Sequence, residues 1–182
     1  DLEDILREIA RLIERLIDEN RKVLEEIARR LKELIEELKK SLKRSEELLR
    51  RLEKELKDSG KKTEELTEKL KRILDESRKE IETLEEKLRR VLKKLKESLD
   101  KLVEEMKRTL EDLERKIRRD GPDKDLLRTL EKVAEDLKRR SERHIRELRR
   151  TLEDLERDVR RLLREDEEKL KRAAEEVKEA IK

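Results

Sequence analysis

Apolar residues recur every eighteen positions along most of this chain. Eighteen residues are five turns of an ideal α-helix, so side chains in this register return to one direction. A heptad repeat would favour a left-handed supercoil and an eleven-residue repeat a right-handed one. The repeat therefore predicts long, nearly straight amphipathic helices. Its clearest series are Leu6, Leu24 and Leu42; Ile13, Leu31 and Leu49; and Leu66, Leu84 and Leu102.

The composition agrees with helices and excludes several other classes. Of the 182 residues, 59% are charged and 32% hydrophobic, a balance that is common in disordered chains. Here the apolar residues keep helical periodicity, which indicates amphipathic helices instead. The chain has no aromatic residue and no cysteine, so a disulfide framework is excluded. No apolar run approaches the roughly 18 residues of a membrane span, and no signal-peptide pattern begins the chain. We expect a soluble protein of undetermined localisation.

Both glycines and the single proline fall in two short segments. In the first, Gly60 suits the left-handed position after a helix end, and Thr63 is a good N-cap for the next helix. In the second, Gly121 ends a helix, Pro122 prevents its continuation, and Asp123 can cap the helix that follows. These segments predict two turns.

The turns leave three breaker-free segments, at about 2–57, 64–119 and 124–181, with Asp1 as a cap for the first. Short turns require antiparallel neighbours. Each segment carries one apolar stripe, and three such stripes can close on one another. The sequence therefore predicts an all-α fold, an elongated and nearly untwisted up-down-up three-helix bundle. We expect one domain over 1–182 and a monomer.

Six polar side chains interrupt the apolar stripes. In such a bundle, residues lie at one level when their numbers add up to about 122 across the first turn and about 244 across the second. This relation predicts two polar layers, each drawing on side chains that are far apart in the sequence. The first layer is Ser45, Ser77 and Asp166; the second is Asn20, Ser141 and His144, with Ser98 within reach of His144.

We interpret both layers as structural. A buried polar group without a partner costs roughly 1–3 kcal/mol. A shared polar layer therefore penalises any register or topology that separates its members, as a single core Asn does in coiled coils. We expect Asp166 to accept hydrogen bonds from Ser45 and Ser77, or to reach an arginine. Thr109 has apolar neighbours and is expected to bond its own helix backbone.

Asn20, Ser141 and His144 are also the residue types of a nucleophile, a base and an orienting group. Continuous helices offer no free backbone N–H at mid-span and no cleft is expected, so no catalytic residue is predicted. His144 and Asp166 lie about 33 Å apart along one helix. A single histidine without cysteine does not make a usual zinc site. No metal site and no cofactor are predicted.

Basic residues are abundant, but the two signs alternate almost everywhere, which cancels the field beyond about 8–10 Å. The chain has no aromatic residue on which bases could stack. Neither nucleic acid nor a membrane is a predicted partner, and we interpret the one local basic excess as a solvated face. It comprises Arg29, Arg30, Lys32, Arg89, Arg90, Lys93, Lys94, Arg146, Arg149 and Arg150.

One alternative remains open. The apolar face of the first segment is wide, and it could receive a fourth helix, which would make the chain part of a heteromeric bundle or a helix-binding receptor. A symmetric homo-oligomer is a separate alternative that the sequence also leaves open. Flanking positions also serve ordinary three-helix packing, so the monomer is the simpler interpretation. The residues that widen this face are Ile5, Leu12, Ile17, Val23 and Ile35.

Together, the eighteen-residue register, the restricted alphabet, the turns at Gly60 and Gly121 and the Glu/Lys/Arg surface resemble one class of protein. That class is the de novo designed helical bundle with an idealised backbone and buried polar layers. The resemblance covers the whole chain. It implies no substrate, no cofactor and no natural biochemical activity. It implies a structural scaffold of high stability.

Overall fold

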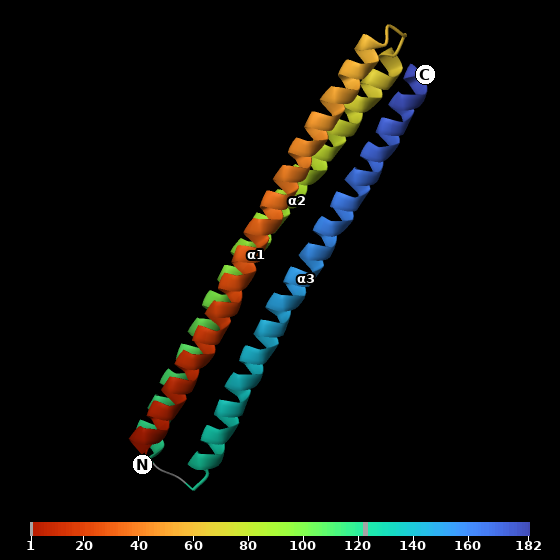
Figure 1. Cartoon of the computed structure of the whole chain (residues 1–182). Helices are drawn as coiled ribbons and strands as arrows, with labels where there is room; N and C mark the ends of the chain where they lie inside the picture. The colour runs from red at the N-terminus through yellow and green to blue at the C-terminus, as the bar shows by residue number, and fades with distance from the viewer. Residues whose placement is uncertain (1, 122–123) are drawn as a thin grey trace. The chain divides into compact units, whose positions relative to one another are not determined.

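The computed structural model describes residues 2–121 and 124–182, and over these residues the chain forms three long α-helices (Figure 1). α1 spans Leu2–Asp58, α2 spans Glu64–Asp120 and α3 spans Leu126–Ile181. The predicted all-α three-helix fold is confirmed. The first two helices agree with the predicted bounds to within one residue.

The turn between α1 and α2 is built around Gly60. Its φ of 70° lies in the left-handed region, as predicted from its place after a helix end. The Ser59 amide donates to the Glu55 carbonyl at 3.1 Å, and the Ser59 hydroxyl donates to the Leu56 carbonyl at 2.7 Å. Both bonds use carbonyl groups that the end of α1 leaves free. α2 begins after Thr63, whose carbonyl accepts the Thr67 amide at 2.9 Å.

The end of α2 is similar, but α3 begins later than predicted. Gly121 also has a φ of 70°, and its amide donates to the Ile117 carbonyl at 2.9 Å. The predicted start of α3 near residue 124 is wrong by two residues. The Asp125 carbonyl accepts the Thr129 amide at 3.0 Å, the first bond of the helix, so Asp125 occupies the N-cap position.

Three of the predicted helix-end roles lie outside the described residues. They are capping by Asp1, helix termination by Pro122 and capping by Asp123.

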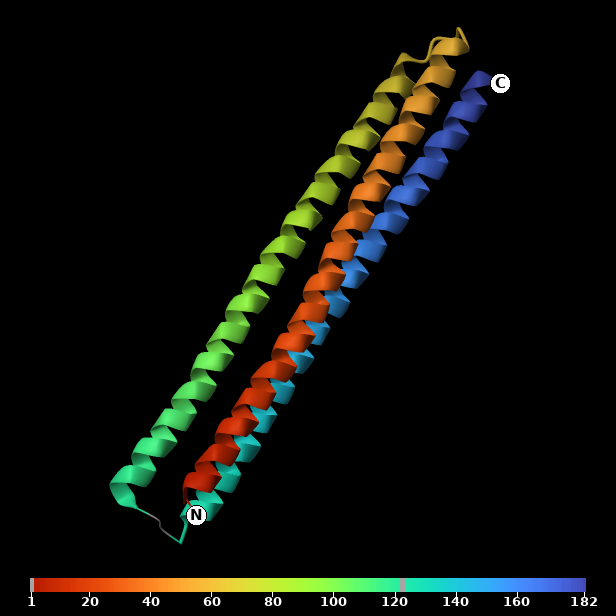
Figure 2. The same cartoon turned by 60° about the vertical axis from the view of Figure 1, so that its left-hand side comes forward.

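The contacts between the helices divide the chain into two compact units. Unit 1 comprises Asp1–Arg29 and Val91–Leu152, and unit 2 comprises Arg30–Arg90 and Glu153–Lys182. Each unit contains one segment of each helix, and these segments can be followed by their colours in Figure 2. Unit 2, for example, has an apolar cluster to which all three helices contribute. Its buried members are Leu49, Leu52, Leu56, Leu70, Ala173 and Val177.

Burial follows the eighteen-residue register. The side chains of Ile13, Leu31 and Leu49 are at most 3% exposed. A parallel series keeps its position even where a polar residue replaces leucine, because Asn20 is as fully buried as Leu38 and Leu56. In these two series the repeat in the sequence is a repeat of core positions, whereas Leu6, Leu42 and Leu66 of the other series are half-buried.

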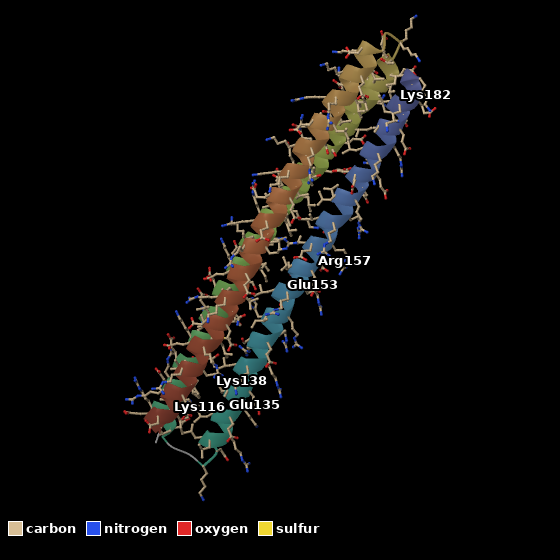
Figure 3. The ribbon with its side chains drawn as sticks, viewed as in Figure 1. Lys116, Glu135, Lys138, Glu153, Arg157 and Lys182 are labelled. Atoms are coloured by element: carbon tan, nitrogen blue, oxygen red, sulfur yellow. The ribbon has the colours of Figure 1, made fainter. Side chains whose placement is uncertain are left out.

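Charged side chains cover the outer faces of the helices (Figure 3). Four of the side chains labelled there are exposed: Glu135 and Lys138 in unit 1, and Glu153 and Arg157 in unit 2. Among residues 2–121 and 124–182, no helix combines the length and the apolar character needed to cross a lipid bilayer.

Candidate functional site

Four polar side chains from all three helices meet in the core of unit 1. The Asn20 side-chain amide donates to the Ser141 hydroxyl at 2.8 Å, and its carbonyl oxygen lies 2.8 Å from His144 Nδ1. His144 Nε2 lies 2.9 Å from the Ser98 hydroxyl. The predicted layer of Asn20, Ser141 and His144 is confirmed as a hydrogen-bond network, and the predicted reach of Ser98 to His144 is confirmed with it.

The backbone fixes the direction of every bond in this network. Asn20 Nδ2 lies 2.8 Å from the carbonyl oxygen of Leu16, which can only accept, so the amide group must face that oxygen. The Asn20 carbonyl oxygen then faces His144 Nδ1, which must carry a hydrogen and donate. In the neutral imidazole, Nε2 is therefore the acceptor and Ser98 donates to it.

Burial makes His144 a poor place for a positive charge. Its side chain is 8% exposed, and desolvation lowers the pKa of His144 below its ordinary 6.5. The charge of Glu147 opposes this effect but is the smaller cause. The imidazole is accordingly neutral near pH 7, in the Nδ1–H form that the network requires.

The second layer, in unit 2, differs from the prediction. Ser45, Ser77 and Asp166 are all buried, as expected for core positions. Neither carboxylate oxygen of Asp166 has a hydrogen-bond partner, although both are inaccessible. The prediction that Asp166 accepts hydrogen bonds from Ser45 and Ser77, or reaches an arginine, is therefore wrong.

Ser45 and Lys169 have partners other than Asp166. The Ser45 hydroxyl donates to the Ser41 carbonyl at 2.9 Å, one turn back on its own helix. Lys169 of α3, whose charge acts on Asp166, lies 4.0 Å from Glu80 of α2 and does not form an ion pair with Asp166. Thr109 of unit 1 also bonds the backbone of its own helix: its hydroxyl donates to the Glu105 carbonyl at 2.9 Å, as predicted.

The surroundings of Asp166 raise the pKa of its carboxyl group. Burial raises the pKa of Asp166 above 3.8, and the charges of Glu80 and Glu165 act in the same direction. The nearby Ser77 hydroxyl and Lys169 favour the charged form, but the hydroxyl is outside hydrogen-bonding geometry. The carboxyl group is held in a setting that favours its neutral form.

Two features of the structure had no counterpart in the predictions. A groove of about 410 Å³ runs beside Ser98 and His144, where continuous helices were expected to leave no cleft. Arg30 was expected to belong to a solvated face, yet its guanidinium lies 2.9 Å from Glu156 of α3. The hydrogen bond to Glu156 raises the pKa of Arg30. The spacing of apolar residues could not predict the groove or the Arg30–Glu156 pair, because both depend on the rotamers of surface side chains.

No group of three or more His, Cys, Asp or Glu side chains in the described part of the chain could hold a metal ion. No protein-family model, no curated protein and no solved structure matches this chain.

Proposed function

We propose that this chain is a structural scaffold, a designed three-helix bundle that has no natural biochemical activity and needs no cofactor or partner. The observation that carries the proposal is the network of Asn20, Ser98, Ser141 and His144, which joins α1, α2 and α3 through four short side-chain and backbone bonds. Its donors and acceptors match only when the three helices keep this register. The network therefore acts as a specificity element within the core of unit 1.

The wide apolar face of α1 supports the same proposal. Ile17, Val23 and Ile35 belong to that face, and all three are at most 9% exposed within the three-helix packing. Most of the face is therefore already covered by α2 and α3. A monomer follows most simply from this burial.

The alternative of a partner helix is favoured by one observation at the start of α1. A groove of about 380 Å³ is lined there by Ile5, Leu12 and Leu127, and Leu127 is 61% exposed. A bound helix would cover these side chains with apolar residues of its own. Binding of a hydrophobic dye distinguishes the two functions, because the scaffold is expected to have no affinity for the dye, whereas an open groove for a partner helix would bind it. Light scattering of the scaffold is expected to give the mass of a monomer.

The specificity role is tested by replacing the network with apolar side chains. The triple variant Asn20→Leu, Ser141→Ala and His144→Leu removes the partners together, so it is expected to stay helical and no less stable. It is also expected to lose its single state and to give mixed oligomers in sedimentation and broadened amide resonances. The matched control is Asp166→Leu, which leaves the network intact and should remain a single species. A triple variant as homogeneous as the parent would contradict the proposal.

A further inference from the structure

Ser98, His144 and Asn20 form a chain of hydrogen bonds that begins at a groove and ends in the core. Ser98 Oγ lies 2.9 Å from His144 Nε2, and His144 Nδ1 lies 2.8 Å from Asn20 Oδ1. Ser98 is half-buried and lines the groove together with His144. We propose that Ser98 is a nucleophile that reacts covalently with small, uncharged phosphoryl and carboxyl esters bearing a good leaving group.

The base is held in the form that the reaction requires. Because the Leu16 carbonyl fixes the Asn20 amide, the Asn20 oxygen accepts the Nδ1 hydrogen of His144. The lone pair of Nε2 is then directed at the Ser98 hydroxyl, as in other sites where a histidine activates a serine. Asn20 is a positioning residue, while Ser98 and His144 are the groups that touch the reacting atoms.

The role does not belong to Ser141, the serine nearest to His144 in the sequence. Ser141 Oγ accepts a hydrogen bond from the Asn20 amide, on the side of the network away from Nε2. The nucleophile therefore comes from α2. The sums of residue numbers place both Ser98 and Ser141 at the level of His144, so they could not show which of the two serines faces Nε2.

The surroundings of His144 favour its basic form. Desolvation lowers the pKa of His144, and Glu147 on α3 opposes it weakly. α1 presents the uncharged amide of Asn20 and the carbonyl of Leu16. The charged groups on α2 beside the groove are Lys94, Glu97, Lys101 and Glu105.

The groove sets the class of reagent. Lys94 and Lys101 precede and follow Ser98 by about one helical turn, so their ammonium groups lie on the same face and can stabilise negative charge on an attacked centre. Glu97 and Glu105 line the same groove and balance those charges. A small uncharged reagent meets no net repulsion there, and Leu102 provides an apolar contact.

With a dialkyl fluorophosphate, the step is a single substitution at phosphorus. The bond between Ser98 Oγ and phosphorus forms, the phosphorus–fluorine bond breaks, and fluoride leaves. The hydroxyl proton passes to His144 Nε2 and then to solvent. The mid-helix backbone has no free N–H to hold an oxyanion, so negative charge on the attacked phosphorus is stabilised by Lys94 and Lys101 instead. The phosphoryl group then blocks the Ser98 hydroxyl, so each chain reacts once and the reaction is stoichiometric.

The test uses the full chain and diisopropyl fluorophosphate near neutral pH, followed by intact mass and peptide mapping. The chain contains no tyrosine or cysteine to compete for the reagent. The expected product carries one phosphoryl group, on Ser98. Its rate of formation should rise with pH through an apparent pKa below 6.5, the ordinary value of histidine. His144→Gln should slow labelling at least about tenfold, the low end of general-base effects.

Ser45→Ala is the matched control, because Ser45 is a buried serine of unit 2 that bonds its own helix, and its loss should leave the rate unchanged. Labelling of Ser59, in the first turn, as fast as Ser98 would overturn the proposal. A rate that does not change with pH near the histidine transition would also overturn it, and that measurement needs no variant that has to fold.

Discussion

At the residue scale, Asp166 is the least satisfied side chain of the described core. The eighteen-residue register places it in series with Leu130 and Leu148, both buried. Asp166→Leu restores that series and removes a carboxyl group without partners. We expect the free energy of unfolding near pH 7 to rise by about 1–4 kcal/mol, measured by guanidinium denaturation. An unchanged or lower denaturation midpoint would show that Asp166 has a partner in solution.

His144 and Asp166 give the two units opposite responses to pH. The folded-state pKa of His144 lies below 6.5, so its contribution to stability is present above 6.5 and is lost as pH falls through the folded pKa. The folded-state pKa of Asp166 lies above 3.8, so its contribution is full below 3.8 and is lost as pH rises through the folded pKa.

Acidification is therefore expected to weaken unit 1 while it strengthens unit 2. Amide hydrogen exchange, corrected for the intrinsic rate at each pH, measures both effects in one sample. Asp166→Asn is the control for unit 2, because an amide cannot titrate and should abolish the gain there. If protection in both units falls equally with acid, the assignment to these two side chains fails.

The sequence predicted the residues of both layers but only one set of bonds. The sums of residue numbers give the level of a side chain along the bundle, which was enough to bring Asn20, Ser98 and His144 together. They do not give the rotation of a short hydroxyl, and the Ser45 hydroxyl bonds the Ser41 carbonyl of its own helix. A backbone carbonyl one turn back on the same helix competes with any partner on another helix for such a hydroxyl.

At the element scale, the two glycines allow the helices to end where they do. Gly60 and Gly121 both have a φ of 70°, and a Cβ built at either position meets no atom within 4 Å. Replacement by alanine therefore adds backbone strain without a steric clash. We expect Gly60→Ala and Gly121→Ala each to lower the free energy of unfolding by about 1–2 kcal/mol. Gly60→Asn, which tolerates this conformation better, should lose less; equal losses for Ala and Asn would argue against the explanation.

Ion pairs between helices differ in value according to their exposure. Arg30 and Glu156, 2.9 Å apart, have side chains that are 32% and 22% exposed. Lys69 and Glu176, 2.7 Å apart, are 52% and 43% exposed. Double-mutant cycles to alanine should give a coupling near 1 kcal/mol for the first pair and nearer 0.2 kcal/mol for the second, the two ends of the range for surface pairs. The reverse order would mean that burial does not govern these pairs.

The limits of the helices were predicted more accurately at glycines than at caps. A left-handed residue after a helix end has few alternatives to glycine, so Gly60 and Gly121 marked those ends well. Several residues near the start of α3 could serve as N-caps. Asp125 occupies the N-cap position of the described helix, although the sequence analysis did not single it out.

At the scale of the whole molecule, stability is the property that the proposed function requires. Buried apolar side chains repeat along all three helices, and the turn between α1 and α2 is short. We expect little loss of helical circular dichroism below about 90 °C, the usual threshold of hyperstable proteins. A cooperative transition near about 60 °C, within the range of ordinary mesophilic domains, would contradict the scaffold proposal.

The coincidence of burial with an eighteen-residue period makes the length of this protein adjustable. Removing or duplicating one such block changes a helix by whole turns, so every remaining side chain keeps its direction. Equivalent blocks taken from α1, α2 and α3 at one level would leave both turns and all other layers unaltered. The chain can thus be treated as a set of interchangeable modules, in which a layer containing a polar network can be copied, moved or omitted as a unit.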